Sequence, residues 1–233
     1  MDVVYVVRDG EKNESLKYSL RSLKNLPHEN VYIIGHKPAW VKNVKHINRI
    51  QRGHNKFQNI SRNMWLASKT ESISDDFIYM DDDYFIMREI DEIYPHHRGD
   101  IQLMINFNEE QGSRIYVKGY TDTRDRLLAL GHTRPLSYEL HIPMVFNKDK
   151  LRHVLELDDE HALNAEIFHV RSFYGNYYHI GGQHMNDVKI RHAYQNRLDW
   201  LLGKRYLSSA GDAPSGFLLK HLKELFPEKS QYE

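Results

Sequence analysis

The stretch Phe77-Ile78-Tyr79-Met80-Asp81-Asp82-Asp83-Tyr84-Phe85-Ile86 decides how the rest of the sequence is interpreted. An apolar run ends in three consecutive carboxylates and a second apolar run follows at once, a pattern that indicates a buried strand ending in an acidic turn. Adjacent carboxylates repel one another and gain little from burial unless a cation lies among them. Hard divalent ions such as Mg²⁺ or Mn²⁺ take oxygen ligands of this kind, usually together with substrate phosphates. The alternative is an acidic turn in water, which the apolar flanks disfavour.

The composition limits the class of protein. The chain has 233 residues, of which 40% are hydrophobic and 12% aromatic, enough for one large domain with a sizeable core. Lys+Arg and Asp+Glu are both 32, so the formal charge of zero argues against a basic nucleic-acid footprint. The absence of cysteine excludes disulfides and cysteine-ligated zinc, whereas the 15 histidines leave a zinc site of His and acids open. The N-terminal run lacks the basic region of a signal peptide and no run reaches membrane length, which predicts a cytoplasmic protein.

Strands and helices are predicted to alternate in the first half of the chain. Apolar runs rich in β-branched residues predict strands over residues 3–7, 31–34, 44–47 and 101–105, in addition to the strand before the acidic turn. Leucines at helical spacing predict a helix over residues 16–23, with Asn13 or Ser15 as its N-cap, and a second helix is predicted over residues 57–68. This order is typical of an α/β fold with a mostly parallel sheet flanked by helices.

The second half is predicted to be more helical. Residues 106–122 contain Gly112 and Gly119 and are expected to form an irregular, flexible excursion over a site. Helices are predicted over residues 123–130, capped by Thr123, and then over residues 147–157, 163–174 and 218–225. No shift in composition marks a domain boundary, so we expect a single domain over residues 1–233.

Short motifs follow one another in order along residues 2–190. They are residues 2–10 (DVVYVVRDG), 16–23, 31–35, 38–40, 77–85 (FIYMDDDYF), His141-Ile142-Pro143, Arg171-Ser172-Phe173 and Asn186-Asp187. Together they resemble the four conserved regions of the Stealth family of sugar-phosphate transferases. Members of that family move a hexose-1-phosphate from a UDP-sugar to a sugar hydroxyl, on a catalytic domain similar to the Rossmann-like GT-A fold of glycosyltransferases.

The resemblance implies a nucleotide-sugar donor, a divalent metal and a hydroxyl-bearing glycan acceptor. It also implies catalytic roles for Asp83, His141 and Arg171. Two features differ from the family: Asp81 stands where the family usually has Asn, and residues 60–65 lack the acidic residue that the family has in the preceding helix. These differences leave open an ordinary glycosyltransferase, which cleaves at the sugar carbon.

Either transfer reaction assigns chemical roles to the candidates. A metal on Asp81 and Asp83 would neutralise the diphosphate, and Arg171 offers a planar fork for phosphate oxygens. His141 titrates in the range that suits removal of a proton from the acceptor hydroxyl, and Glu139 is the alternative base. A structural histidine at position 141 and an arginine stacked on aromatic rings at position 171 are the non-catalytic alternatives.

Contacts to the nucleotide sugar are predicted at the ends of the first strands and in the fourth motif. The candidates are Arg8, Asp9, Gly10, Arg62, Asn63, Asp82, Asn186 and Asp187. The Asn186-Asp187 pair could also contact a metal or only cap a helix. We expect residues 1–105 to bind the donor and residues 106–233 to bind the acceptor. A phage DNA base as acceptor and a carbohydrate-binding protein without turnover are further alternatives, although zero net charge disfavours DNA.

Overall fold

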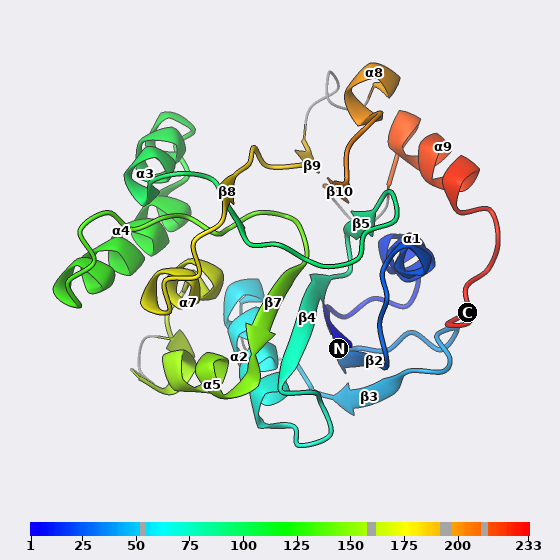
Figure 1. Cartoon of the computed structure of the whole chain (residues 1–233), viewed down its shortest axis with the longest axis horizontal. Helices are drawn as coiled ribbons and strands as arrows, with labels where there is room; N and C mark the ends of the chain where they lie inside the picture. The colour runs from blue at the N-terminus through cyan, green and yellow to red at the C-terminus, as the bar shows by residue number, and fades with distance from the viewer. Residues whose placement is uncertain (52–54, 158–161, 192–196, 211–213) are drawn as a thin grey trace.

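A mostly parallel sheet is the centre of the structure (Figure 1). The computed structural model describes residues 1–51, 55–157, 162–191, 197–210 and 214–233, and within them five strands form this sheet in the order β3-β2-β1-β4-β7. Their bounds are β1 (Asp2–Val7), β2 (Val31–Gly35), β3 (Lys45–Asn48), β4 (Asp76–Asp81) and β7 (Met144–Asn147). The first four strands are parallel and β7 is antiparallel to β4. The predicted α/β fold is therefore confirmed.

The order in which the chain adds strands to the sheet reverses at β1, which pairs with β2 on one side and with β4 on the other. Val6 lies opposite Ile34 of β2 and Asp81 of β4, so these strands end level with one another. In open α/β sheets, ligands bind beyond the carboxyl ends of the strands at such a reversal. The register therefore places the acidic turn beside the residues that follow β1.

Helices cover both faces of this sheet. Helix α1 (Glu14–Ser22), extended by the short 3₁₀ helix η1 (Leu23–Asn25), lies on one face. Helices α2 (Lys56–Lys69), α5 (Lys148–Glu156) and α7 (Val170–Tyr177) lie on the other (Figure 1). Asparagine side chains cap three of them: Asn13 accepts from the amide of Leu16, Asn55 from Gln58 and Asn147 from Lys150. The helices predicted over residues 16–23, 57–68 and 147–157 are confirmed.

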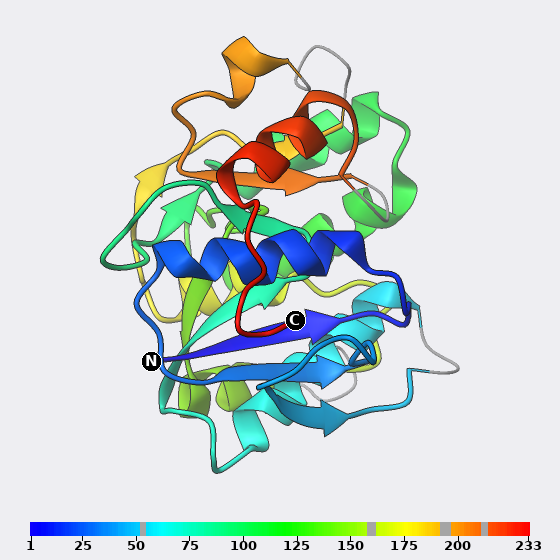
Figure 2. The same ribbon diagram turned by 90° about the vertical axis from the view of Figure 1, so that its right-hand side faces the viewer.

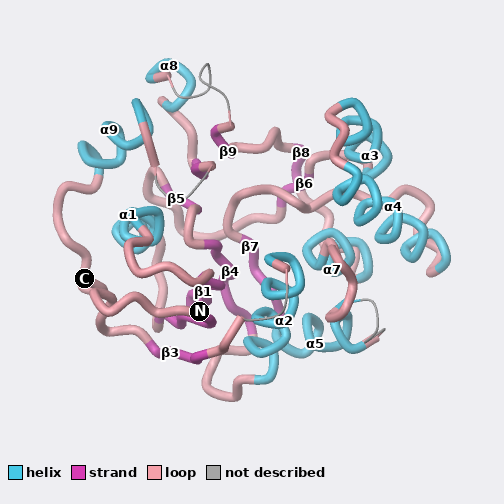
Figure 3. The backbone as a smooth tube through the Cα atoms, turned by 180° about the vertical axis from the view of Figure 1, so that it is seen from behind, coloured by secondary structure: helices cyan, strands magenta, loops and turns pink. Residues whose placement is uncertain are grey.

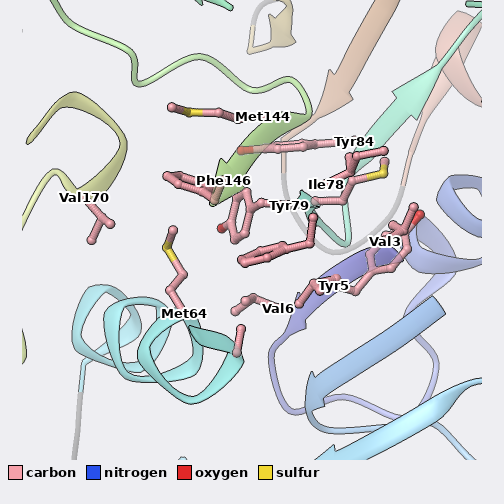
Figure 4. Close-up of a cluster of buried hydrophobic side chains, with 14 of the residues drawn as sticks. Val3, Tyr5, Val6, Met64, Ile78, Tyr79, Tyr84, Met144, Phe146 and Val170 are labelled. Atoms are coloured by element: carbon pink, nitrogen blue, oxygen red, sulfur yellow. The ribbon is translucent and has the colours of Figure 1, made fainter. Parts of the chain in front are cut away.

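The core lies between the sheet and α2. Figure 4 shows Tyr79 of β4 and Phe146 of β7 beside one another, with Met64 of α2 on the same side of the sheet. The rings of Tyr79 and Phe146 meet edge to face at 6.0 Å between centroids. All three side chains are buried. Their packing holds β4, the strand that precedes the acidic turn, against α2.

A smaller sheet lies on the far side of α1 from the central sheet (Figure 2). It consists of β5 (Tyr84–Ile86), β10 (Tyr206–Ser209) and β9 (Lys189–Ile190), covered by α8 (Leu198–Leu201) and α9 (Gly216–Leu225). Phe85, Leu207 and Leu222 form part of its separate apolar core. The terminal helix predicted over residues 218–225 is thereby confirmed. Because β4 continues into β5 through Asp82 and Asp83, the acidic turn links the two sheets.

Residues 101–130 form a helical hairpin, which corrects two predictions. The predicted strand at Ile101–Ile105 is the start of α3 (Ile101–Glu110), because Asp100 caps it and because residues 101 and 105, one helical turn apart, are its buried residues. The predicted irregular segment 106–122 is the end of α3 and most of α4 (Arg114–Ala129), which also contains the expected cap Thr123. Figure 3 shows this hairpin at the edge of the molecule, with the short strands β6 (His96–His97) and β8 (Gln183–His184) beside it.

The glycine in this hairpin serves packing. A Cβ atom at Gly119 would lie 2.5 Å from Cγ2 of Ile167, so only glycine lets α4 approach the segment before α7 this closely.

The helix predicted over residues 163–174 begins only at Val170. Side chains of α2 bind the preceding carbonyls: Asn55 donates to Glu166 O at 2.8 Å and Gln58 to Asn164 O at 2.9 Å. Side-chain amides therefore satisfy these carbonyls, which do not need the backbone amides of a helix. Residues 163–169 form a non-helical segment that packs over α2. Among the helices of the described residues, none combines the length and the apolar character needed to cross a membrane.

Candidate active site

A cavity of about 640 Å³ lies beside the carboxyl end of β4. Its charged lining consists of Asp81, Arg98, Glu139, Arg171, Asp187 and Arg191, joined by His141 and His169. Aromatic and apolar side chains of α2, α4 and the segment before α7 form the opposite wall, where the rings of Phe57 and Tyr116 meet edge to face at 5.5 Å. The cavity lies within the size range of small-molecule sites and combines apolar walls with convergent polar groups.

Each carboxylate of the acidic turn has its own partner. Asp82 Oδ2 accepts from Asn13 Nδ2 at 2.6 Å and lies 3.5 Å from Arg8 Nε. Asp83 Oδ2 accepts from Lys189 Nζ at 2.9 Å. Asp81 accepts from the hydroxyl of Tyr79 and faces the cavity. The turn is therefore tied to α1 through Asp82 and to the smaller sheet through Asp83.

The neighbouring cations do not fully offset the burial and mutual repulsion of the carboxylates in this turn. Burial raises the pKa of Asp82 and of Asp83, and the charge of Asp81 raises both further, although Arg8 and Lys189 oppose the shift. Asp83 Oδ1 is buried and has no hydrogen-bond partner among the described residues. A buried carboxylate oxygen without a donor is costly, and a cation near Asp83 would remove that cost.

The donor atoms fit a divalent metal ion that brings further ligands with it. Asp81 is open to the cavity and Asp83 has an unpaired oxygen, and both are the hard oxygen donors that Mg²⁺ and Mn²⁺ prefer. Within the part of the chain that the structure describes, no three His or acidic side chains are grouped as a complete metal site. Two carboxylates with substrate phosphates and waters are the usual way in which Mg²⁺ is held.

His141 and Asp187 form a tightly fixed pair on the cavity wall. His141 Nδ1 lies 3.0 Å from Oδ1 and 2.9 Å from Oδ2 of Asp187, and the backbone amide of His141 donates to Oδ1 at 3.1 Å. Arg191 also donates to Asp187, at 2.8 Å. Burial opposes ionisation of Asp187, but the hydrogen bond and charge of His141 and the charges of Arg98 and Arg191 hold its pKa far below the usual range.

This pairing determines which ring nitrogen of His141 can act as a base. An ionised Asp187 accepts a hydrogen bond from the protonated Nδ1. In the neutral ring, the nitrogen with a free lone pair is therefore Nε2. Nε2 has no bonding partner among the described residues, and His141 lines the cavity. The arrangement is that of a base oriented by a carboxylate. The sequence analysis assigned Asp187 to the nucleotide sugar, whereas the structure places it on His141.

Arg171 holds the segment on which His141 lies. Its guanidinium is buried and donates to Leu140 O at 2.5 Å, to Ile142 O at 2.9 Å and to the hydroxyl of Tyr84 at 3.2 Å. These bonds fix the backbone on both sides of His141. The geometry therefore favours a positioning role for Arg171 over the predicted contact with a phosphate.

Glu139 lies in a buried network with His169 and Ser172. It accepts from the amide and hydroxyl of Ser172 at 3.0 and 3.1 Å, and His169 Nδ1 lies 3.9 Å away. Burial would raise its pKa, but the positive charges of His169 and Arg171 and the hydrogen bond from the Ser172 amide hold the pKa of Glu139 at about 2. A carboxylate with so low a pKa is a weak base at neutral pH, which favours His141 over Glu139.

The low pKa of Glu139 predicts a pH-dependent contribution to stability. The folded-state pKa of about 2 lies below the usual glutamate value of 4.5, so the contribution is full above pH 4.5 and is lost as the pH falls towards 2. We expect Glu139→Gln to lower the unfolding free energy at pH 7 by roughly 2–3 kcal/mol and to flatten its decline below pH 4.5. Urea denaturation at several pH values measures both effects. Glu224→Gln, at an exposed surface ion pair, is the control, and an equal effect of both changes would contradict the prediction.

The predicted nucleotide contacts lie in different places. Arg8, Asp9 and Gly10 follow β1 and are exposed beside Asp82, and Gln51 donates to Asp9 at 3.4 Å. Asn186 is exposed next to Asp187. Thus the structure gathers the residues after β1 at the acidic turn.

Arg62 is turned away from this edge, whereas Asn63 lies buried beneath it, because a Cβ atom at Gly35, the last residue of β2, would lie 3.3 Å from Asn63 Nδ2. Arg62 binds Leu163 O and Asn164 on the outer side of α2, at 3.2 and 2.7 Å. Asn63 is fully buried and accepts from Arg49 at 3.1 Å. Both side chains are thus bonded within the protein, and their assignment to the nucleotide sugar stays a prediction.

Several site residues were missed by the sequence analysis. Asn13, Lys189, Arg98 and His169 contact the acids or line the cavity. The signal available for Lys189 was its position two residues after Asp187, just beyond the last resembling motif. Arg98 precedes Gly99, whose φ of +95° marks a tight corner that a sequence alone does not assign to a site.

Comparison with solved structures finds the same architecture in LgtC. An active-site mutant of LgtC superposes with a TM-score of 0.55 at 12% identity, covering 100% of this chain and 98% of that one. The chain therefore shares its fold with LgtC. Mouse xyloside xylosyltransferase 1 matches with a TM-score of 0.43 and 11% identity, over 92% of this chain and 100% of that one. No protein-family model matches the chain, and no curated protein matches it significantly.

Proposed function

We propose that the protein is a metal-assisted transferase that uses a nucleotide sugar. It moves a sugar-1-phosphate, or the sugar alone, from a UDP-sugar type of donor to a hydroxyl group of a glycan. The observation that carries the proposal is the His141–Asp187 pair, which opens into the cavity beside the acidic end of β4. A base oriented in this way serves deprotonation of a hydroxyl, the step that both transfers share.

The donor occupies the edge formed by β1 and β4 in this proposal. Arg8, Asp9 and Gly10 contact its nucleotide part, and Asp82 anchors Arg8 from behind. Asp81 and Asp83 would hold Mg²⁺ or Mn²⁺, and the bound ion would supply positive charge at the diphosphate. Lys189 supplies a further positive charge at Asp83. Asn186 is the candidate contact from the second half of the chain. Residues 106–233, with the helical hairpin and the aromatic wall of the cavity, bind the acceptor.

The acceptor hydroxyl gives its proton to His141 Nε2. Asp187 stabilises the positive charge that the ring then carries, and Arg171 keeps the ring in place through the carbonyls of Leu140 and Ile142. In sugar-phosphate transfer, the acceptor oxygen bonds to the phosphorus nearer the sugar, the P–O bond to the other phosphate breaks and UMP leaves. In glycosyl transfer, the oxygen bonds to the anomeric carbon, the C–O bond breaks and UDP leaves.

Nucleotide release distinguishes the two reactions. The protein is incubated with a panel of UDP-sugars, Mn²⁺ or Mg²⁺ and glycan acceptors, and the released nucleotide is identified by chromatography. We expect UMP, the product of sugar-phosphate transfer that the Stealth-like motifs imply. UDP would establish the glycosyl alternative. Binding of a UDP-sugar without any release would favour a carbohydrate-binding protein, and a nucleic-acid acceptor is tested by adding DNA to the same panel.

Replacement of Asp83 tests the metal site. Asp83→Asn keeps the shape of the side chain, and because burial already raises the pKa of Asp83, we expect the variant to fold. We expect turnover to fall at least ~100-fold, since the metal and its charge are lost at the diphosphate. Mn²⁺ binding, followed by electron paramagnetic resonance, should weaken in parallel.

Asp122→Asn, at an exposed ion pair of α4, is the control and should bind Mn²⁺ as the natural protein does. Full turnover of Asp83→Asn would contradict the metal site.

A further inference from the structure

Arg98 is a cavity residue whose side chain the proposed reaction does not use. It follows β6, and its backbone amide donates to Ser137 O at 2.7 Å while Ser137 N donates to Gly99 O at 2.8 Å. The adjacent His97 O accepts from Met185 N at 2.9 Å. Arg98 is thus attached to a rigid corner between three segments, and its half-buried side chain lines the cavity.

The guanidinium of Arg98 has no hydrogen bond or ion pair among the residues that the structure describes, unlike Arg171 and Arg191 on the same cavity. Its charge acts on Asp187, but that carboxylate is already bonded to His141 and Arg191. One carboxylate therefore faces two guanidinium groups at this end of the cavity. A partly desolvated guanidinium gains most from an anionic oxygen group, which it can bind through two parallel hydrogen bonds.

The position of Arg98 points to the acceptor side of the cavity. Along the edge of the sheet, Arg8 follows β1, Asp81 ends β4 and His141 precedes β7, which is the next strand. Arg98 directly follows β6, which pairs with β8 and lies beside the helical hairpin in Figure 3. In the proposed function the donor phosphates have Arg8 and Lys189, which pair with Asp82 and Asp83.

We propose that Arg98, aided by the charge of Arg191, binds an anionic group on the acceptor, a carboxylate or a phosphate. That the bound molecule is an acceptor rests on the transfer reaction proposed above. The binding of an anion at Arg98 does not, because it depends only on the residues that line the cavity. It names the substrate class as an acidic glycan, such as one that contains a uronic acid or a phosphorylated sugar.

Matched neutral and acidic sugars test the subsite without requiring turnover. Binding of p-nitrophenyl β-glucuronide and p-nitrophenyl β-glucoside, and of glucose 6-phosphate and glucose, is measured by ligand-observed NMR on the whole chain at low salt. We expect the acidic member of at least one pair to bind roughly tenfold more tightly, as for a charge-assisted bidentate contact. Arg98→Gln should remove this preference and leave the binding of the neutral member within about twofold.

Arg134→Gln is the control, because Arg134 is a highly exposed arginine that pairs with Asp100 outside the cavity. It makes the same change in charge and should retain the preference. Equal binding of both members of every pair, or no binding of any, would overturn the proposal. So would weaker binding of UDP to Arg98→Gln, since Arg98 would then serve the donor. If the preference is lost as expected but no donor releases a nucleotide, the proposed transfer fails while the anionic subsite stands.

Discussion

Replacing His141 by alanine should lower the turnover number by about 10²–10⁴-fold, the range for loss of a positioned general base. The ring has few other tasks: Nδ1 is held by Asp187, and Tyr84 packs edge to face against it at 6.2 Å between centroids. The acceptor hydroxyl would then lose its proton only to water. Steady-state kinetics with the donor identified by nucleotide release measure the effect, and the KM for the donor should change little because His141 lies beyond Asp81 along the sheet edge.

Asp187→Asn is the sharper companion to that variant. An asparagine amide can present its NH₂ group to Nδ1, which moves the proton to Nε2 and leaves no lone pair towards the cavity. We expect a large fall in turnover with nearly unchanged binding of both substrates. His153→Ala, which removes a histidine of α5 that bonds Tyr177 of α7, is the control and should keep full turnover. A fully active His141→Ala protein would contradict the assignment of His141 as the base and would favour Glu139 instead.

Replacing Arg171 by methionine should destabilise the protein by about 3 kcal/mol, because two buried carbonyls lose their donor at roughly 1–3 kcal/mol each. For a chain of this length such a loss lowers the melting temperature by roughly 6–12 °C. Turnover should fall as well, since the segment that bears His141 is no longer fixed. Thermal denaturation and kinetics on the same preparation measure the two effects.

Arg171→Lys separates positioning from phosphate binding. A lysine retains the charge but lacks the planar fork that reaches Leu140 O and Ile142 O together, so we expect part of the stability to return and turnover to stay low. If Arg171 instead contacted the donor phosphate, both variants would raise the KM for the donor and leave the melting temperature nearly unchanged. That result would contradict the positioning role.

The strongly patterned parts of the sequence were sufficient to predict the sheet. β1, β2 and β4 are continuous apolar runs, and the asparagine caps of α1 and α5 stand at the expected positions. The run from Ile101 to Ile105 was ambiguous, because short apolar runs suit either a strand or a helix. Asp100 before it was the overlooked signal for a helix.

Site residues were harder to predict wherever tertiary contacts decide their roles. His141 and Asp81 both line the cavity, while their roles as base and metal ligand stay predictions. The partner of His141, however, is 46 positions away, and the partner of Asp83 is 106 positions away. No local spacing encodes such contacts. For the same reason Arg171 looked available for phosphate, although its hydrogen bonds are made to backbone carbonyls that no pattern reveals.

The link between the two sheets has a consequence for how the protein is made. β5, which starts directly after Asp83, pairs with β10, and the ammonium group that faces Asp83 belongs to β9. A ribosome-bound chain that has completed β4 therefore carries three neighbouring acids before Lys189 has been synthesised. The smaller sheet therefore cannot be completed until β9 and β10 have been synthesised, after every strand of the central sheet.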